Sequence, residues 1–219
     1  MRRPSWGLVA ALALSGCALL GKSEPLVPRY YAPADGAAAP PTALHPGLQL
    51  RLGRIEGGSH LRERMVVRRS SQELAYREDR RWTERPEVYL RRALDRALFE
   101  ERGVVQALSG RAVALDVELV AFEEVETPHL ARLQVRLVLR DERLALLAET
   151  VTVERPIEGP LGGGPQAVVE ALSWALRQAA TQVADQVVAR LAELPPRPAP
   201  GAPAGSGGLD PSAGASAGR

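Results

Sequence analysis

The sequence predicts an α+β fold, in which an antiparallel sheet (a meander plus short N-terminal strands) carries two helices on one face. Alternating apolar and polar residues between about 113 and 154 have the period of half-buried strands. Apolar residues recur at helical spacing in two other stretches, 84–102 and 166–194. The flanking segments are rich in Pro, Ala and Gly and offer little to bury, so one folded domain is expected.

Short strands are expected first. Leu48, Leu50 and Leu52 alternate with polar residues or glycine, and Gly57-Gly58 then turns the chain. Residues 65–69 and 72–76 follow as two further short strands. Tyr30-Tyr31 lies in a Pro/Ala-rich segment, where it forms either a short first strand or a contact that returns to the domain.

The first helix is expected from Glu84 to Arg102, with Pro86 in the first turn, where its missing N–H costs nothing. Three long strands of a meander come next, and a tight polar turn at 141–143 joins the last two. Arginines that face acidic residues across the polar side of these strands would form a solvated ladder. The longest helix, 166–194, ends before Pro195-Pro196.

The chain therefore divides into four parts: a signal segment at 1–16, a lipidated cysteine with a flexible tether at 17–46, the folded domain at 47–194, and a disordered tail at 195–219. The first part has Arg2-Arg3, an apolar run too short to span a bilayer, and small residues before Cys17.

Cys17 is the single cysteine of the chain, and Leu14-Ser15-Gly16-Cys17 resembles the bacterial lipobox. That resemblance implies a mature protein that begins at an acylated Cys17 and is held at a membrane surface. An uncleaved anchor or an ordinary export signal is the alternative. Ala18, where the enterobacterial sorting rule would have Asp for retention at the inner membrane, favours the periplasmic face of the outer membrane.

Composition argues against a nucleic-acid partner. The formal charge of +2 comes from Arg2 and Arg3, because the rest of the chain balances 26 basic side chains against 26 acidic ones. A neutral domain has no long-range attraction for phosphates.

No catalytic site, metal site or cofactor is expected. The histidines, His45, His60 and His129, have no metal-ligand spacing. The Gly-rich stretch 158–165 lacks the ending of a phosphate loop and is interpreted as a connector. Glu123, Glu124 and Glu126 are interpreted as a solvated strand end, not as paired catalytic carboxylates.

Several short motifs in the middle of the chain resemble the ABC-type transport auxiliary lipoproteins, the PqiC-like family. They are Glu73-Leu74-Ala75-Tyr76, then Arg81-Trp82-Thr83-Glu84-Arg85-Pro86 opening a helix, the strands 115–123 and 131–141, and Ala171 to Leu176 in the last helix. The resemblance covers about residues 28–194. Thr83, where the family often has Ala, and the long C-terminal tail depart from it.

The resemblance implies a non-enzymatic accessory of a lipid transport system that moves phospholipid between inner and outer membranes. Its partner would be the periplasmic MCE-domain protein of that system. A structural lipoprotein that assists another envelope complex, such as lipopolysaccharide export or a secretion pore, remains an alternative, as does a lipid carrier with its own cavity.

Trp82, Tyr76 and Arg81 are the candidate partner-binding residues, because Trp82 and Tyr76 flank the entrance to the first helix and lie outside its apolar stripe. The alternative for Arg81 is a structural ion pair with Glu73 or Glu84. The alternative for Trp82 is a hydrophobic staple that packs the helix start. Trp174 shares a helix with the apolar stripe and is expected to be buried.

Overall fold

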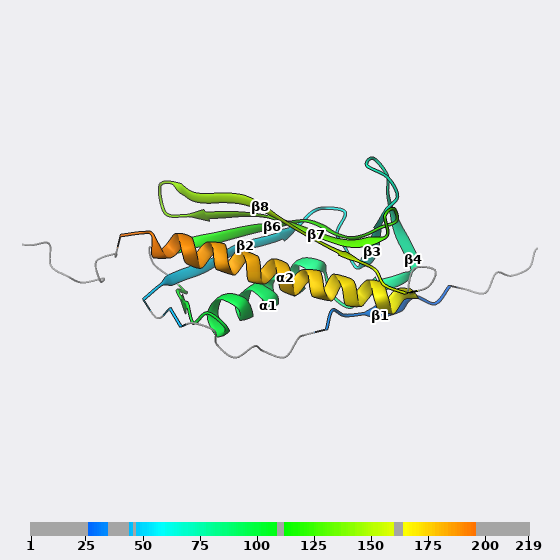
Figure 1. Ribbon diagram of the computed structural model, residues 1–219, viewed down its shortest axis with the longest axis horizontal. Helices are drawn as coiled ribbons and strands as arrows, with labels where there is room; N and C mark the ends of the chain where they lie inside the picture. The colour runs from blue at the N-terminus through cyan, green and yellow to red at the C-terminus, as the bar shows by residue number, and fades with distance from the viewer. Residues whose placement is uncertain (1–25, 35–43, 46, 109–111, 160–163, 196–219) are drawn as a thin grey trace, which may run out of the picture.

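A computed structural model describes residues 26–34, 44–45, 47–108, 112–159 and 164–195. It shows one mixed sheet with both helices against one face, and the sheet stays open, so the predicted α+β class is confirmed (Figure 1). The signal segment, Cys17 and residues 196–219 lie outside the described residues. The strands are β1 (Arg29–Tyr31), β2 (Gln49–Gly57), β3 (Arg64–Arg68), β4 (Leu74–Trp82), β5 (Val105–Gln106), β6 (Val113–Val125), β7 (Leu130–Arg140) and β8 (Ala145–Pro156).

Strand β6 is the centre of the sheet. One of its edges pairs with β7, which pairs with β8, and these three strands form the predicted antiparallel meander. The other edge is shared by two strands in series, because β2 pairs with residues 113–119 and β3 with residues 123–125, both parallel to β6. Alternation with a period of two is the same for parallel and antiparallel strands, so the sequence pattern could not predict these parallel pairs.

Two helical segments cover the inner face. Helix α1 (Pro86–Asp95) continues into a π-helical turn, η1 (Arg96–Glu100), and Leu90, Leu94 and Leu98 are fully buried as their spacing predicts. Helix α2 (Gly164–Ala192) runs the length of the sheet beneath β7 and β8. Trp174 is partly buried there, with the Arg155 guanidinium 5.2 Å from its ring centre.

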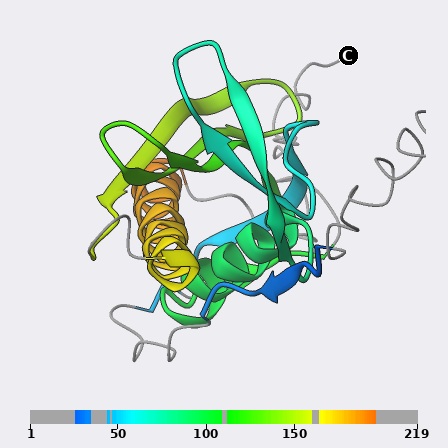
Figure 2. The ribbon, with the colours of Figure 1, turned by 90° about the vertical axis from the view of Figure 1, so that its right-hand side faces the viewer.

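The fold begins earlier than residue 47. Strand β1 lies within the segment expected to be a tether, yet it pairs in parallel with β4 at the sheet edge (Figure 2). The Thr83 N–H donates to the Tyr31 carbonyl, and the Ala34 N–H donates to Ser173 Oγ on α2 at 3.1 Å. Residues 29–34 are therefore held from two sides, and Tyr30-Tyr31 forms the short strand that the sequence left open.

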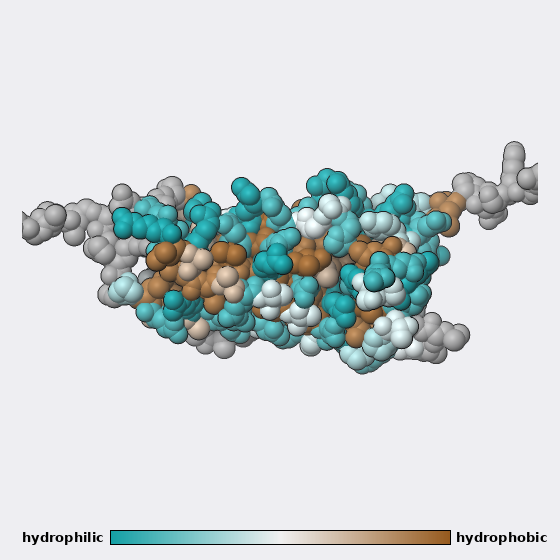
Figure 3. All heavy atoms as spheres, turned by 90° about the horizontal axis from the view of Figure 1, so that it is seen from above, coloured by the Kyte–Doolittle hydropathy of each residue, from teal (hydrophilic) through white to brown (hydrophobic). Residues whose placement is uncertain are grey.

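Figure 3, a view from above, shows hydrophilic residues interspersed with apolar patches on this side of the molecule. The predicted arginine ladder is present there, since Arg136 pairs with Glu118 at 3.1 Å, Arg140 with Asp116 at 2.7 Å and Arg132 with Glu154 at 2.7 Å. Exposed pairs of this kind contribute at most about 1 kcal/mol each. The outer face is therefore exposed to solvent, whereas the helices cover the opposite face.

Candidate functional site

Trp82 is a core residue. Its side chain is 1% exposed, and its ring lies 5.0 Å from that of Phe122 and 6.1 Å from that of Tyr89. The expectation of an accessible aromatic at the helix entrance is therefore wrong for Trp82, and the packing alternative describes it. The reason is topological: β4 continues to Trp82 and, in pairing with β1, turns this side chain into the core.

The other two predicted residues lie nearer the surface. Tyr76 is 40% exposed on β4, and its hydroxyl donates a long hydrogen bond of 3.4 Å to the His60 carbonyl. The Arg81 guanidinium donates to the carbonyls of Arg77 and Arg80, both at 2.9 Å. Leu74 lies two residues before Tyr76 on the same strand, is 37% exposed and adds apolar area to this surface. The β3–β4 hairpin therefore presents Leu74 and Tyr76 to solvent.

Two consecutive glutamates fix this hairpin to β6. Glu123 is 0% and Glu124 5% exposed, so the prediction of a solvated strand end is wrong for both. The Arg68 Nε from β3 donates to Glu123 at 2.6 Å, and the Arg77 guanidinium from β4 donates to Glu124 at 2.8 Å. Neighbouring residues of a strand point to opposite faces, so the two pairs hold the hairpin from both sides.

The hydrogen bond to Glu124 is the main reason why the pKa of Arg77 is raised, with burial acting in the opposite direction. Arg77 therefore keeps its charge, and its bidentate contact with Glu124 suits a structural role for this arginine better than proton transfer. Sequence reasoning missed it because the arginines come from strands 47 and 55 residues away.

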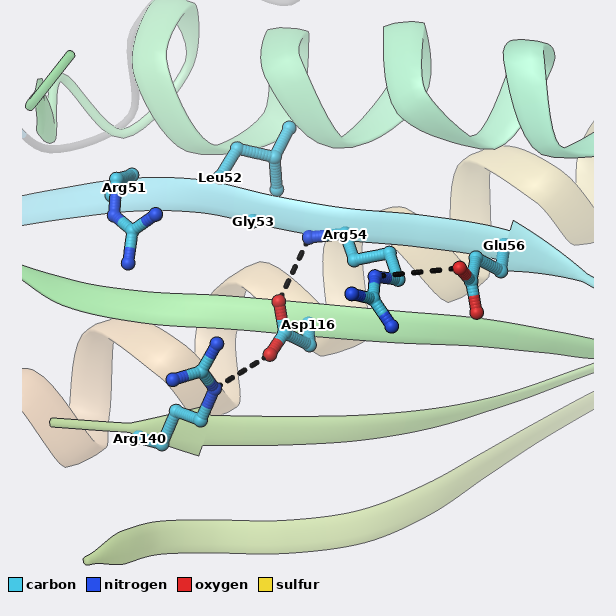
Figure 4. Close-up of a pocket in the computed structure, with 7 residues that line it drawn as sticks. All are labelled: Arg51, Leu52, Gly53, Arg54, Glu56, Asp116 and Arg140. Atoms are coloured by element: carbon cyan, nitrogen blue, oxygen red, sulfur yellow. Dashed lines mark hydrogen bonds and ion pairs between the residues drawn. The ribbon is translucent and has the colours of Figure 1, made fainter. Parts of the chain in front are cut away.

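The outer face also holds an open hollow of about 520 Å³, lined by Arg51, Leu52, Gly53, Arg54, Glu56, Asp116 and Arg140 (Figure 4). Asp116 is central to it. One of its oxygens accepts from the Arg54 N–H at 2.8 Å and the other from Arg140 Nε at 2.7 Å. Arg51 projects from β2 toward β6, and its buried Nε has no hydrogen-bond partner.

A bulge in β2 makes room for this carboxylate. The pairing of β2 with β6 shifts between Leu52 and Ile55, and a Cβ on Gly53 would lie 2.2 Å from Asp116 Oδ1. Burial acts to raise the pKa of Asp116, but the hydrogen bonds and charges of Arg140 and Arg54 outweigh it and lower the pKa. Asp116 therefore stays ionised and engaged, which suits a structural role better than proton transfer.

The sequence held only a weak signal for this hollow. Gly53 interrupts the alternation of β2, and Asp116 places a carboxylate at a polar position of β6.

Among the described residues, no cluster of three or more His, Cys, Asp or Glu side chains is arranged to hold a metal ion. Within the same ranges, no helix is long and apolar enough to cross a membrane.

These features define a single α+β domain with a polar, arginine-rich sheet face and a protruding hairpin, surfaces suited to contact with another molecule. The family model for the ABC-type transport auxiliary lipoprotein component matches residues 31–184. The chain belongs to this family, as the sequence motifs indicated, and the match runs from Tyr31, the last residue of β1, through most of α2.

Two solved structures share the fold at low sequence identity. A Xanthomonas campestris protein of family DUF330 is 21% identical with a TM-score of 0.64, over 74% of this chain and 96% of that one. An uncharacterised protein is 15% identical with a TM-score of 0.60, over 74% and 99%. A minor lipoprotein from Acinetobacter baumannii, 15% identical, has a TM-score of 0.39 over 64% and 92%. The search of curated proteins found no match.

Proposed function

We propose that this protein is a non-enzymatic accessory of a lipid transport system that acts between the inner and outer membranes. It is anchored to the periplasmic face of the outer membrane by acyl chains on Cys17 and binds the MCE-domain protein of that system. The observation that carries the proposal is the family match, which spans most of the described fold, from the last residue of β1 into α2. An auxiliary component of a transporter works by contact, and the surfaces of this fold are suited to contact.

The β3–β4 hairpin is the proposed contact with the MCE protein. Tyr76 and Leu74 supply exposed aromatic and apolar area, and Arg81 supplies a cation on the same strand. Trp82 supports this surface from inside, because it ends the strand that carries Tyr76 and packs it on Phe122. The ion pairs Arg68–Glu123 and Arg77–Glu124, here called the arginine–glutamate clamps, hold the hairpin on β6. A hairpin that is already ordered lowers the entropic cost of binding.

A pull-down of the MCE protein by the mature lipoprotein tests the contact. Truncation of an aromatic at an interface centre costs about 2 kcal/mol or more, roughly a thirtyfold loss of affinity. Tyr76→Ala should therefore bind much more weakly while it melts like the wild type. The matched control is Leu144→Ala, because Leu144 is 67% exposed in the β7–β8 turn. If Tyr76→Ala binds as well as that control, the contact lies elsewhere.

The anchor has its own test. Cells that express the wild-type chain and are fed radioactive palmitate should yield a labelled protein, and Cys17→Ser should yield an unlabelled one, because the chain has no second thiol for lipid. Label that persists in the Cys17→Ser protein would contradict the anchor.

A further inference from the structure

Few residues separate Cys17 from the folded domain in the sequence. Residues 29–34 are fixed to β4 and to α2, so only the eleven residues 18–28 separate Cys17 from the sheet. A fully extended chain of that length spans at most about 40 Å, and a flexible one has a root-mean-square span of about 20 Å. Had the segment been free as far as residue 46, the reach would have been more than twice as long.

That segment leaves the fold at one end of an elongated domain. In Figure 1, β1 and the start of α2 lie at the right-hand end, and α2 then runs to the left. A helix of 29 residues is about 43 Å long, comparable to the extended reach of the segment. An acylated Cys17 therefore keeps the β1 end within about 40 Å of the bilayer, and the end of α2 lies about one helix length farther along the domain.

The side chains at the β1 end suit a lipid surface. Leu26 is 58%, Val27 79% and Tyr30 65% exposed, which places three large apolar groups within five residues. Arg29, between them, is exposed and has no ion pair among the described residues. Arg80, opposite Arg29 on β4, is itself held by Asp79 at 3.5 Å and Glu124 at 3.9 Å. Aliphatic and aromatic groups beside a free cation are the composition of interfacial membrane contacts.

We propose that Leu26, Val27, Arg29 and Tyr30, here called the N-terminal patch, dock on an anionic lipid surface and hold the domain upright on its anchor. The inference rests on the proposed acylation of Cys17. The docked domain directs the start of β6, the β7–β8 turn and the end of α2 into the periplasm, and it keeps the β3–β4 hairpin, which pairs with β1, at the membrane end, where the MCE protein would have to reach it. The short segment 18–28 and the exposed apolar groups at the β1 end favour this polarity, whichever protein is then bound.

A depth measurement on the acylated chain tests the proposal. An acylated Cys17 leaves no free thiol, so one introduced cysteine is the single site for a fluorescent label. The mature lipoprotein with Val27→Cys is compared with Leu108→Cys, whose parent leucine is 87% exposed beyond β5. Both are reconstituted into phosphatidylglycerol vesicles that contain a nitroxide lipid. The label at position 27 should be strongly quenched and that at 108 hardly at all; equal quenching at both positions overturns the proposal.

The second arm separates docking from mere proximity. The chain from residue 17 with Cys17→Ser, which has no lipid, should still sediment weakly with phosphatidylglycerol vesicles. One arginine near an anionic surface contributes about 1 kcal/mol, so Arg29→Gln should reduce the partition coefficient about fivefold. Arg143→Gln, in the exposed β7–β8 turn, is the matched control and should not change it. Equal partition coefficients for the two variants overturn the lipid contact. The contact is also overturned if the N-terminal patch binds a protein and the chain does not sediment with vesicles.

The two proposals fail differently. An intact mass without acyl chains overturns the anchor and the upright orientation that depends on it, whereas the sedimentation of the Cys17→Ser chain tests the lipid contact by itself. An acylated chain with an unquenched label at position 27 overturns the docking alone and leaves the anchor and the MCE contact in place.

Discussion

Trp82 shows how strongly one residue can depend on the strand that carries it. The aromatic cluster with Phe122 and Tyr89 joins β4, β6 and α1, so the indole links the hairpin to the helix layer. Truncation of such a buried ring leaves a cavity, and Trp82→Ala should lower the free energy of unfolding by about 3–5 kcal/mol. Thermal and urea melts measure it. Tyr76→Ala, half-exposed on the same strand, is the control, and equal losses for both would contradict the assignment.

Asp116 should make stability depend on pH in the acid range. Its pKa is lower in the folded state than in the unfolded one, so its contribution is fully present above the unfolded value, near 4. The contribution is lost as the pH falls through the folded pKa. Asp116→Asn should therefore flatten the acid side of a stability curve measured by urea unfolding at a series of pH values.

Asp95 should change the pH dependence of stability in the opposite direction in the same experiment. Burial is the main cause that raises its pKa, and the charge of Arg91 offsets this only in part. The folded state therefore binds the Asp95 proton more tightly than the unfolded state, and stability falls as the pH rises through that range. Asp95→Asn should gain stability at neutral pH relative to the wild type, whereas Asp116→Asn should lose it. The same sign for both variants would contradict these assignments.

At the scale of elements, the two arginine–glutamate clamps decide whether the β3–β4 hairpin stays on β6. Loss of one partner of a buried pair leaves an uncompensated charge and costs about 3–5 kcal/mol. Arg77→Leu should approach the lower end, because its own side chain is 30% exposed. Arg77→Leu combined with Glu124→Leu should recover most of the loss. The exposed pair Arg136–Glu118 is the control, and its removal should cost under about 1 kcal/mol.

The sequence predicted the elements that have strong local patterns. The β6–β7–β8 meander and both helices appear where alternation and the Leu90-Leu94-Leu98 stripe placed them. The features that the sequence did not predict depend on contacts between segments that are far apart in the chain. The burial of Glu123 and Glu124 needs arginines from another hairpin, and the parallel pairing of β2 and β3 with β6 needs the whole topology. A composition rich in Pro and Ala likewise concealed β1, because three residues are too few for a period.

At the scale of the whole molecule, the two ends of the chain should differ in their importance for stability. Deletion of residues 26–34 removes β1 and its bonds to β4 and α2, so the melting temperature should fall by more than about 4 °C, the equivalent of roughly 1 kcal/mol for a domain of this size. Deletion of 196–219, a segment with little apolar area, should change it by less. Calorimetry on both deletions measures this, and a larger loss from the C-terminal deletion would show that the tail packs on the fold.

Because β2 and β3 lie in series along one edge of β6, the sheet has a seam at residues 58–63 where neither strand continues the other. The chain crosses it in a turn in which the Gly58 N–H donates to the Leu119 carbonyl and the Leu61 N–H to the Gly58 carbonyl. On that edge of β6 the hairpin is therefore joined to the sheet through residues 123–125 and the Arg68–Glu123 and Arg77–Glu124 pairs. Removal of one of these pairs should let the amide protons of β3 and β4 exchange with solvent sooner than those of β2, β6 and β7, while the intact hairpin stays fixed on β6.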